Sequence, residues 1–161
     1  MKTLPPPREP AELTRFIESR YHARHRTQLA ELAELSGLVE AVHAGDEHVP
    51  VGLAALLRRL IGELEVHMKK EELILFPAMR RAAGALDVPI AAMRDDHGDH
   101  AADVAEIGRL TNDLNPPRDA CRSWTRLYAG LREFVGDLQE HIRLEDDVLF
   151  PQFETPGVHL V

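Results

Sequence analysis

Two copies of one short motif, a histidine followed four residues later by a glutamate, stand out in this sequence. They are His67 with Glu71 and His141 with Glu145. On an α-helix this spacing places both side chains on one face, about 40° apart and one turn along the axis, so that both can reach a common centre. Imidazole nitrogens and carboxylate oxygens together suit first-row transition metals. The motifs therefore predict a metal site.

Both motifs belong to a longer internal repeat. A shift of 74 residues places HMKKEELILFP (67–77) on HIRLEDDVLFP (141–151), and a shift of 75 residues places His22 and His25 on His97 and His100. Each half of the repeat holds one H-x-x-H pair and one H-x-x-x-E pair. The pattern indicates a duplicated helical hairpin.

The elements that must position these residues are four helices, expected at about 10–43, 50–83, 88–113 and 118–153. Pro10 suits a first helical turn, Gly45-Asp46, Gly84 and Asn115-Pro116-Pro117 interrupt the helices, and Asp87 is expected to cap the third. No stretch alternates with period two, so the predicted fold class is all-α, an antiparallel up-down-up-down four-helix bundle. Residues 1–9 are expected to be a flexible proline-rich lead, 10–154 the bundle and 155–161 a frayed tail.

Steps of three and four residues predict which side chains face the bundle axis. On the second helix these positions are Leu53, Leu57, Leu60, Leu64, His67, Glu71, Ile74 and Ala78. On the fourth they are Leu127, Leu131, Phe134, Leu138, His141, Glu145, Val148 and Gln152. On the first and third they are His22, His25, Leu29 and Leu32, and His97, His100, Val104 and Ile107. Polar residues thus replace leucines at one depth of the core.

Buried glutamates among histidines require a positive charge. An unpaired buried carboxylate costs several kcal/mol, and no lysine or arginine lies on the predicted axis-facing positions at that depth. One or two metal ions would satisfy both glutamates and the imidazole lone pairs, and a metal-free polar network is the alternative. Two carboxylates able to bridge favour a pair of metals. We expect two iron ions with an oxo or hydroxo bridge, since thiolates are absent, with manganese next and zinc less typical.

The sequence resembles a known family, the hemerythrin-like di-iron domain of the repair-of-iron-centres proteins. The matching runs are RYHARHRTQLAEL (20–32), VHAGDEHVP (42–50), HMKKEELILFPAM (67–79), MRDDH (93–97), NPPRDACRSW (115–124) and HIRLEDDVLFP (141–151). The resemblance places the iron ligands on His22, His67, Glu71, His97, His141 and Glu145. Many family members also carry a small N-terminal domain with paired cysteines, where this chain has a proline-rich lead. Roles that need those thiols would require another chain or would be absent.

Composition narrows the partners. The 161 residues include 27 acidic and 19 basic side chains, for a net charge of −8, which argues against nucleic acid. A single cysteine excludes an internal disulfide and a four-cysteine metal site in one chain. No apolar run has the length of a signal peptide or a membrane span, so no membrane partner and a cytoplasmic location are expected.

Other singled-out residues receive lesser roles. His25, His100, Tyr21 and Glu63 are expected to line the pocket or contact the ligands from outside, with His25 and His100 as spare ligands in the alternative. His43 and His48 are expected at a helix end and a loop, and no role is assigned to His159. Cys121 is interpreted as an ordinary small residue rather than a nucleophile, since no histidine is near it in sequence. The Phe76-Pro77 and Phe150-Pro151 pairs are expected to shape the helix ends.

The resemblance implies an iron protein of the nitrosative and oxidative stress response that supplies iron for repair of damaged iron–sulfur clusters. Two alternatives use the same centre. One is an enzyme that reduces nitric oxide or peroxide, for which an electron donor would be needed. The other is a reversible binder or sensor of dioxygen or nitric oxide, although oxygen-carrying hemerythrins use a fifth histidine and an aspartate bridge. No residue is assigned a catalytic role.

Overall fold

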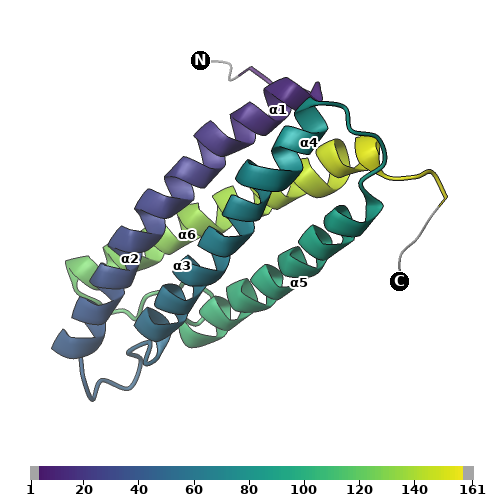
Figure 1. The fold of residues 1–161 in the computed structure, drawn as a ribbon. Helices are drawn as coiled ribbons and strands as arrows, with labels where there is room; N and C mark the ends of the chain where they lie inside the picture. Colours follow the sequence, from purple (N-terminus) through teal and green to yellow (C-terminus); the bar gives the residue numbers. More distant parts are fainter. Residues whose placement is uncertain (1–3, 158–161) are drawn as a thin grey trace.

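The chain folds into four long helices connected by three loops (Figure 1). The structure, a computed structural model, describes residues 4–157. Its helical segments are α1 (Pro10–Ile17), η1 (Glu18–His22), α2 (Ala23–Val42), α3 (Leu53–Lys70), η2 (Glu71–Leu75), α4 (Phe76–Arg80), α5 (Asp87–Leu110), α6 (Arg122–Arg143), η3 (Leu144–Leu149) and η4 (Phe150–Phe153). Segments that follow one another without a break form single helices, and no strand occurs within 4–157. The predicted all-α fold class is confirmed.

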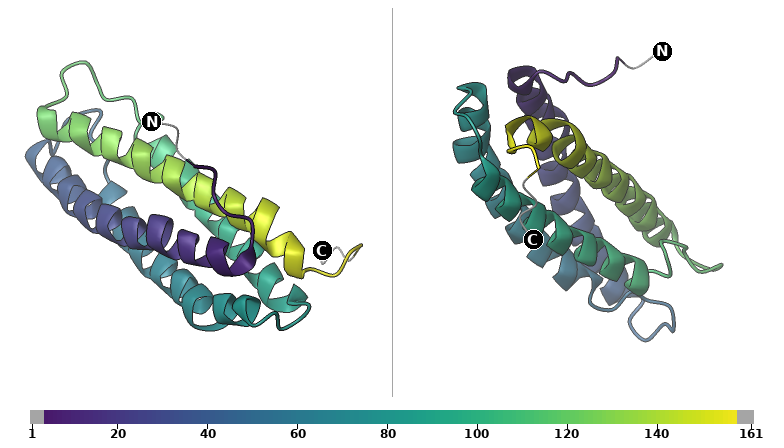
Figure 2. Two further views of the ribbon diagram at one scale, coloured as in Figure 1. Left: turned by 90° about the horizontal axis from the view of Figure 1, so that it is seen from above. Right: turned by 90° about the vertical axis from the view of Figure 1, so that its right-hand side faces the viewer.

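The four helices run antiparallel to their chain neighbours, and the loops lie at alternate ends of the bundle (Figures 1 and 2). The start of α1 and the end of η4 meet at the same end as the loop between α4 and α5. There the side-chain amide of Gln152 donates a hydrogen bond to the Arg8 carbonyl, at 3.0 Å. Within the described residues no helix is long and apolar enough to cross a membrane.

Several helix ends follow from local chemistry. Pro10 is the first helical residue, and the Glu9 carboxylate accepts hydrogen bonds from the next free backbone N–H groups, those of Ala11 and Glu12. At the start of α6, the Cys121 sulfur accepts from the Trp124 N–H at 3.4 Å. The second and fourth helices begin at Leu53 and Arg122, a few residues later than expected.

The expectation for Asp87 was wrong. It lies inside the first turn of α5 and makes no capping hydrogen bond. Its carboxylate accepts instead from the backbone N–H and the hydroxyl of Thr155, both at 2.8 Å. The C-terminal segment is therefore held at Thr155 rather than frayed from that residue, and residues 158–161 lie outside the described part. The same helix ends at Leu110, earlier than predicted, because residues 112–114 adopt positive φ angles.

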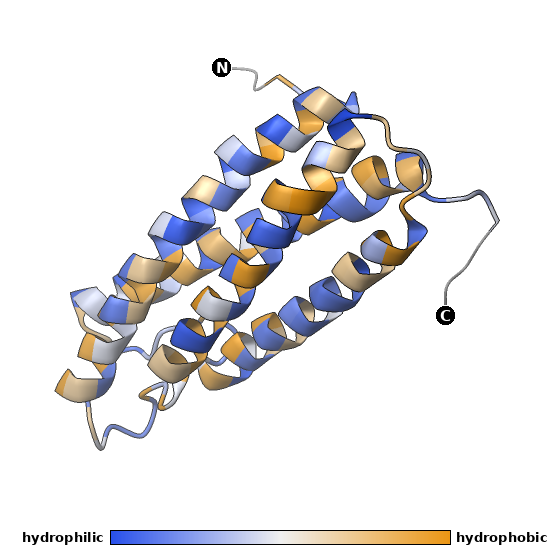
Figure 3. Cartoon of the chain, in the orientation of Figure 1, coloured by the Kyte–Doolittle hydropathy of each residue, from blue (hydrophilic) through white to orange (hydrophobic). Residues whose placement is uncertain are grey.

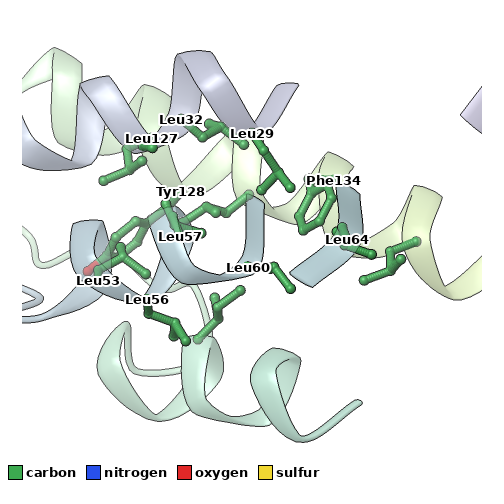
Figure 4. Packing of buried hydrophobic residues seen from close by; sticks show 14 of the residues in the cluster. Leu29, Leu32, Leu53, Leu56, Leu57, Leu60, Leu64, Leu127, Tyr128 and Phe134 are labelled. Carbon is green, nitrogen blue, oxygen red and sulfur yellow. The ribbon is translucent and has the colours of Figure 1, made fainter. Parts of the chain in front are cut away.

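The apolar core consists of two clusters stacked along the bundle. The larger joins α2, α3, α5 and α6 near the ends that carry the 43–52 and 111–121 loops, and Figure 4 shows Leu57, Leu60 and Phe134 among the side chains that fill it. The smaller, at the opposite end, joins α1, α4, the start of α5 and η3–η4, with Ile17, Phe76 and Phe150 at its centre. Between them the buried residues are polar.

Polar and apolar residues alternate around every helix surface (Figure 3). The axis-facing pattern predicted from sequence nevertheless fails beyond the two glutamates. Ile74 is 67% exposed and Gln152 is exposed, while Leu75 and Leu149 are buried. Ala78 and Val148 are only half-buried. In both helices the buried face moves by one residue, because the segments η2 and η3 are π-helical and each turn takes an extra residue.

Truncation of the larger cluster should destabilise the protein. Leu60 is fully buried, so Leu60→Ala is expected to lower the free energy of unfolding by about 2–5 kcal/mol through lost burial and a cavity. Leu38, 52% exposed, is the matched control, and Leu38→Ala should change it by less than about 0.5 kcal/mol. Urea unfolding of the metal-free proteins measures both. Equal effects would contradict the placement of the core.

Candidate metal centre

A layer of buried polar residues crosses the bundle between the two apolar clusters. All four long helices contribute to it, and each of its six central residues is at most 4% exposed. They are His22, His67, Glu71, His97, His141 and Glu145. The structure thus brings together all six residues that the sequence singled out as ligands.

Three of the four helices change to a π-helical turn at this layer. The backbone N–H groups of Ala23, Phe76 and Phe150 each bond to the carbonyl five residues earlier. His22 ends one π turn, Glu71 begins the second and Glu145 lies in the third. Such turns recur at functional sites because they widen the helix and redirect side chains. Pro77 and Pro151, which have no N–H to donate, follow directly after two of these turns.

The ligand atoms form two adjoining groups that share both glutamates. One group is His22, His141, Glu71 and Glu145, and the other is His67, His97, Glu71 and Glu145; within each group the atoms lie within 4.8 Å of one another. The Nε2 atoms of His22 and His67 lie 3.2 and 3.3 Å from Glu71 Oε1. The arrangement would hold two metal ions, each lined by two histidines and by both glutamates.

Most atoms that face the centre lack a well-directed hydrogen bond, and only Nε2 of His141 has one, with Glu145 at 3.0 Å. The buried atoms without one are Nε2 of His22, His67 and His97, both oxygens of Glu71 and Oε1 of Glu145, although the nearest of them lie 2.9–3.3 Å apart. Orphaned polar atoms at this density are costly unless something else satisfies them. A pair of cations would satisfy all of them at once, since each atom carries a lone pair directed to the shared space. The residues present therefore fit a two-metal centre.

The electrostatics of the cluster reflect the two carboxylates. Burial by itself would lower the pKa of His22, but the Glu71 and Glu72 carboxylates outweigh it and raise that pKa to about 9. Burial opposes Asp146 and Glu145 in the same way at His97, whose pKa rises to about 10. Without metal, protons on these histidines replace the missing positive charge.

The outward-facing nitrogens of the four histidines, in contrast to most of the inward-facing ones, are hydrogen-bonded. Nδ1 of His22 lies 2.8 Å from Glu72, that of His67 lies 2.9 Å from Asp96, and that of His97 lies 2.8 Å from Asp146. Nδ1 of His141 lies 3.0 Å from Nε2 of His25. These bonds fix each ring so that Nε2 points to the centre, as in other metal sites with histidine ligands.

The sequence matches a known domain family. Residues 17–153 match the model of the hemerythrin HHE cation-binding domain, which is most of the chain. The chain belongs to the hemerythrin HHE family.

Named relatives are bacterial. Over 143 residues the chain is 43% identical to a probable iron–sulfur cluster repair protein of Haemophilus influenzae and 44% identical to the iron–sulfur cluster repair protein YtfE of Pectobacterium atrosepticum. It is 46% identical over 142 residues to YtfE of Edwardsiella ictaluri. Each match covers 88% of this chain but only 64–65% of the relative. This HHE domain thus spans less than two thirds of the length of those proteins.

Sequence reasoning overlooked the three carboxylates that hold the histidines of this HHE domain. Glu72, Asp96 and Asp146 each stand next to a predicted ligand in the sequence, respectively Glu71, His97 and Glu145. That adjacency was the available signal. It was not decisive, because a neighbouring residue on a helix points about 100° away and its partner lies on another helix.

The four residues expected around the ligands all lie in the HHE domain near the centre. His25 is hydrogen-bonded to His141, and the Tyr21 ring stacks on His141 with centroids 5.7 Å apart. His100 packs edge-on against His67 with ring centroids 5.0 Å apart. Burial lowers the pKa of His25 to about 2 and that of His100 to about 4, so both are neutral at pH 7. Glu63 is farther out, on the wall of a cavity.

That cavity opens between α3 and α5 and has a volume of about 610 Å³. His67 and His100 form part of its wall, so it reaches the histidines of the HHE centre. Four acidic side chains and one lysine also line it: Glu63, Asp96, Asp99, Asp103 and Lys70. An excess of carboxylates beside a buried centre favours cations over anions.

Cys121 has a histidine neighbour that sequence distance concealed. Its sulfur lies 3.1 Å from Nε2 of His43, which also packs on Trp124 at a ring distance of 4.9 Å. His48 is exposed in the following loop, as expected, and His159 lies outside the described residues. Cys121 therefore has no histidine near it in the sequence but contacts one in the folded chain.

Metal uptake by the HHE centre should release protons. A pH of 7.5 lies below the raised pKa values of His22 and His97, so both imidazoles carry a proton in the metal-free protein. An imidazole that binds a metal ion must be neutral. We expect about two protons released for each pair of ions bound, measured by calorimetry in buffers of different ionisation enthalpy. His22→Ala should release about one proton fewer, and the exposed control His48→Ala should match the unchanged protein. Binding heats independent of the buffer would contradict this prediction.

Proposed function

We propose that the chain holds two iron ions and supplies iron for the repair of iron–sulfur clusters damaged by nitrosative or oxidative stress. The ligands proposed are His22 and His141 for one ion and His67 and His97 for the other, with Glu71 and Glu145 bridging both. The names of the relatives support this function. Because the match leaves about a third of those proteins uncovered, the activity is a proposal for this chain.

Iron is proposed because of the donor set. Four imidazole nitrogens and two carboxylates, with no thiolate in either group, are typical of non-haem iron, while manganese accepts a similar set and zinc rarely occupies such paired sites. Iron bound here would have coordination positions that no protein residue fills. These positions would be open to ligand exchange or to a small ligand. The protein's own residues orient the imidazoles through the Nδ1 hydrogen bonds and exclude water with the two flanking apolar clusters.

The acidic cavity is the observation that favours iron exchange over the other functions. It connects the surface with His67 through a wall that includes Glu63, Asp96 and Asp99. Carboxylates attract and bind a cation on its way to or from the centre, whereas dioxygen and nitric oxide are uncharged and gain nothing from them. A path of this chemistry suits transfer of the ion itself.

The proposed partners follow from this function. Damaged iron–sulfur proteins would receive the iron, and an electron donor would be needed if the centre is reduced before release. Nitric oxide and dioxygen are small ligands that could reach the same centre. The alternative functions, reduction of nitric oxide or peroxide and reversible binding of a diatomic gas, would show as turnover with a reductant or as a stable ligand complex.

Metal content is the direct test. Protein purified without added metal should contain about two irons per chain and show visible charge-transfer absorption that changes with nitric oxide or a reductant. Metal removal should lower the melting temperature, because ions that bind only the folded state stabilise it. Stoichiometric zinc, or no metal after anaerobic iron loading, would contradict the proposal.

Ligand variants test the assignment. His67→Ala and His141→Ala should lose iron yet stay largely helical by circular dichroism, and the double variant Glu71→Ala/Glu145→Ala should lose both ions, because it removes the bridging carboxylates. Glu106→Ala, on the surface of α5, is the matched control and should keep normal iron content. Full iron in the double variant would be incompatible with the ligand set.

Two assays separate donor from enzyme. The iron-loaded protein is mixed with an apo iron–sulfur protein, sulfide and a reductant, and the appearance of cluster absorption is measured. In parallel, consumption of nitric oxide or peroxide is followed with the same reductant. Cluster formation that depends on the loaded protein, without catalytic consumption, is the expected result. Multiple turnovers without cluster formation would favour the enzyme.

A further inference from the structure

The internal duplication provides a comparison within one molecule, because each ligand has a counterpart in the other hairpin. His22 corresponds to His97, and Glu72, the partner of His22, corresponds to Asp146, the partner of His97. Both bonds to Nδ1 are 2.8 Å long. In this half of the arrangement the two hairpins are equivalent.

The other pair of histidines breaks the equivalence. His67 donates from Nδ1 to the Asp96 carboxylate at 2.9 Å. The counterpart of His67 is His141, but the counterpart of Asp96 is Tyr21, which stacks on the His141 ring and offers no carboxylate. His25 takes over as the Nδ1 partner of His141, at 3.0 Å.

The proton positions on this histidine pair follow from the geometry. Nε2 of His141 faces Glu145 and Glu71, at 3.0 and 4.0 Å, so in the metal-binding form its ring proton is on Nδ1 and is donated to Nε2 of His25. His25 then keeps its own proton on Nδ1, which is buried and has no partner. Nδ1 of His141 therefore donates its hydrogen bond to a neutral group, whereas Nδ1 of His67 donates to an anion.

Of the three carboxylates on Nδ1, Asp96 is the one without a lysine or arginine partner among the described residues. Glu72, the partner of His22, accepts two hydrogen bonds from the Arg26 guanidinium, at 3.0 and 2.9 Å, which offset its charge. Among the described residues no lysine or arginine forms an ion pair with Asp96, and Arg94 lies 3.5 Å from Asp146. A carboxylate on Nδ1 makes the ligand nitrogen more basic, and loss of such a partner typically weakens metal affinity 10–100-fold.

We propose that the two metal positions are unequal. The position between His67 and His97 binds its ion more tightly and fills first, and the position between His22 and His141 binds its ion more weakly and fills second. Asp96 and His25 are the positioning residues that set the difference. This inference rests on the proposed function only in that the centre holds two ions.

The test is a stepwise titration of the metal-free, full-length chain with Co²⁺, repeated anaerobically with Fe²⁺. Two binding steps are expected, the first at least about 10-fold tighter than the second. His141→Ala should keep the tight step and lose the weak one, and His67→Ala should lose the tight one. Circular dichroism of each variant checks that it folds.

The positioning residues provide variants that keep all six ligands. Asp96→Asn should weaken the first step about 10-fold and leave the second unchanged, because it replaces the anion on His67 with a neutral group. Asp95→Asn is the matched control, since Asp95 lies next to Asp96 on α5 but is exposed and outside the cavity wall. His25→Ala should weaken only the second step, and His25→Gln, which keeps a neutral acceptor, should restore it.

The outcomes separate this inference from the function. Normal loading with two equal steps, or an Asp96→Asn protein weakened only in the second step, would overturn the inequality and leave the iron centre standing. A folded wild-type chain that binds neither cobalt nor iron would overturn both. Uniform weakening of both steps by every variant would show a merely structural role for Asp96 and His25.

Discussion

Two glutamates buried among four histidines are the constraint on which the structure depends. Glu71 and Glu145 are fully buried, yet no lysine or arginine of the described residues pairs with them. Their charges must be compensated by protonated imidazoles or by cations, since unpaired buried carboxylates would consume most of the stability of a domain this size. In the metal-free protein the carboxylates raise the pKa values of His22 and His97, so that protons on these imidazoles balance the negative charge.

The rest of the bundle holds that polar layer in place. An apolar cluster on each side keeps water out and sets the depth of the helices, and three π turns adjust their rotation where the ligands project. Outer carboxylates then hold the rings by Nδ1. The acidic cavity interrupts this enclosure between α3 and α5, next to His67, and a second cavity between α5 and α6 reaches His97. An acidic opening beside a buried centre favours the passage of cations.

Duplication produced two similar half-sites, and one substitution made them differ. Where the second hairpin has Asp96, the first has Tyr21, so that His141 is supported by the neutral His25. An iron donor would benefit from such inequality, because one ion could leave while the other still joined three of the four helices through His67, His97 and Glu145. The acidic cavity thus provides a path for the ion, and the Nδ1 partners of the histidines set how tightly each position binds it.

The sequence by itself determined the helices, the duplication and the two His–Glu pairs, because periodicity and H-x-x-x-E spacing are properties within one helix. Spacing did not separate His22 and His97 from His25 and His100, a choice that came from the family resemblance. Only the tertiary structure decided the burial of Leu75 in place of Ile74, since each π turn adds a residue and rotates everything after it by about 100°. It also decided that Asp96 holds His67 and that His43 meets Cys121. Such contacts join different helices, and their partners depend on rotation and depth, which no local pattern encodes.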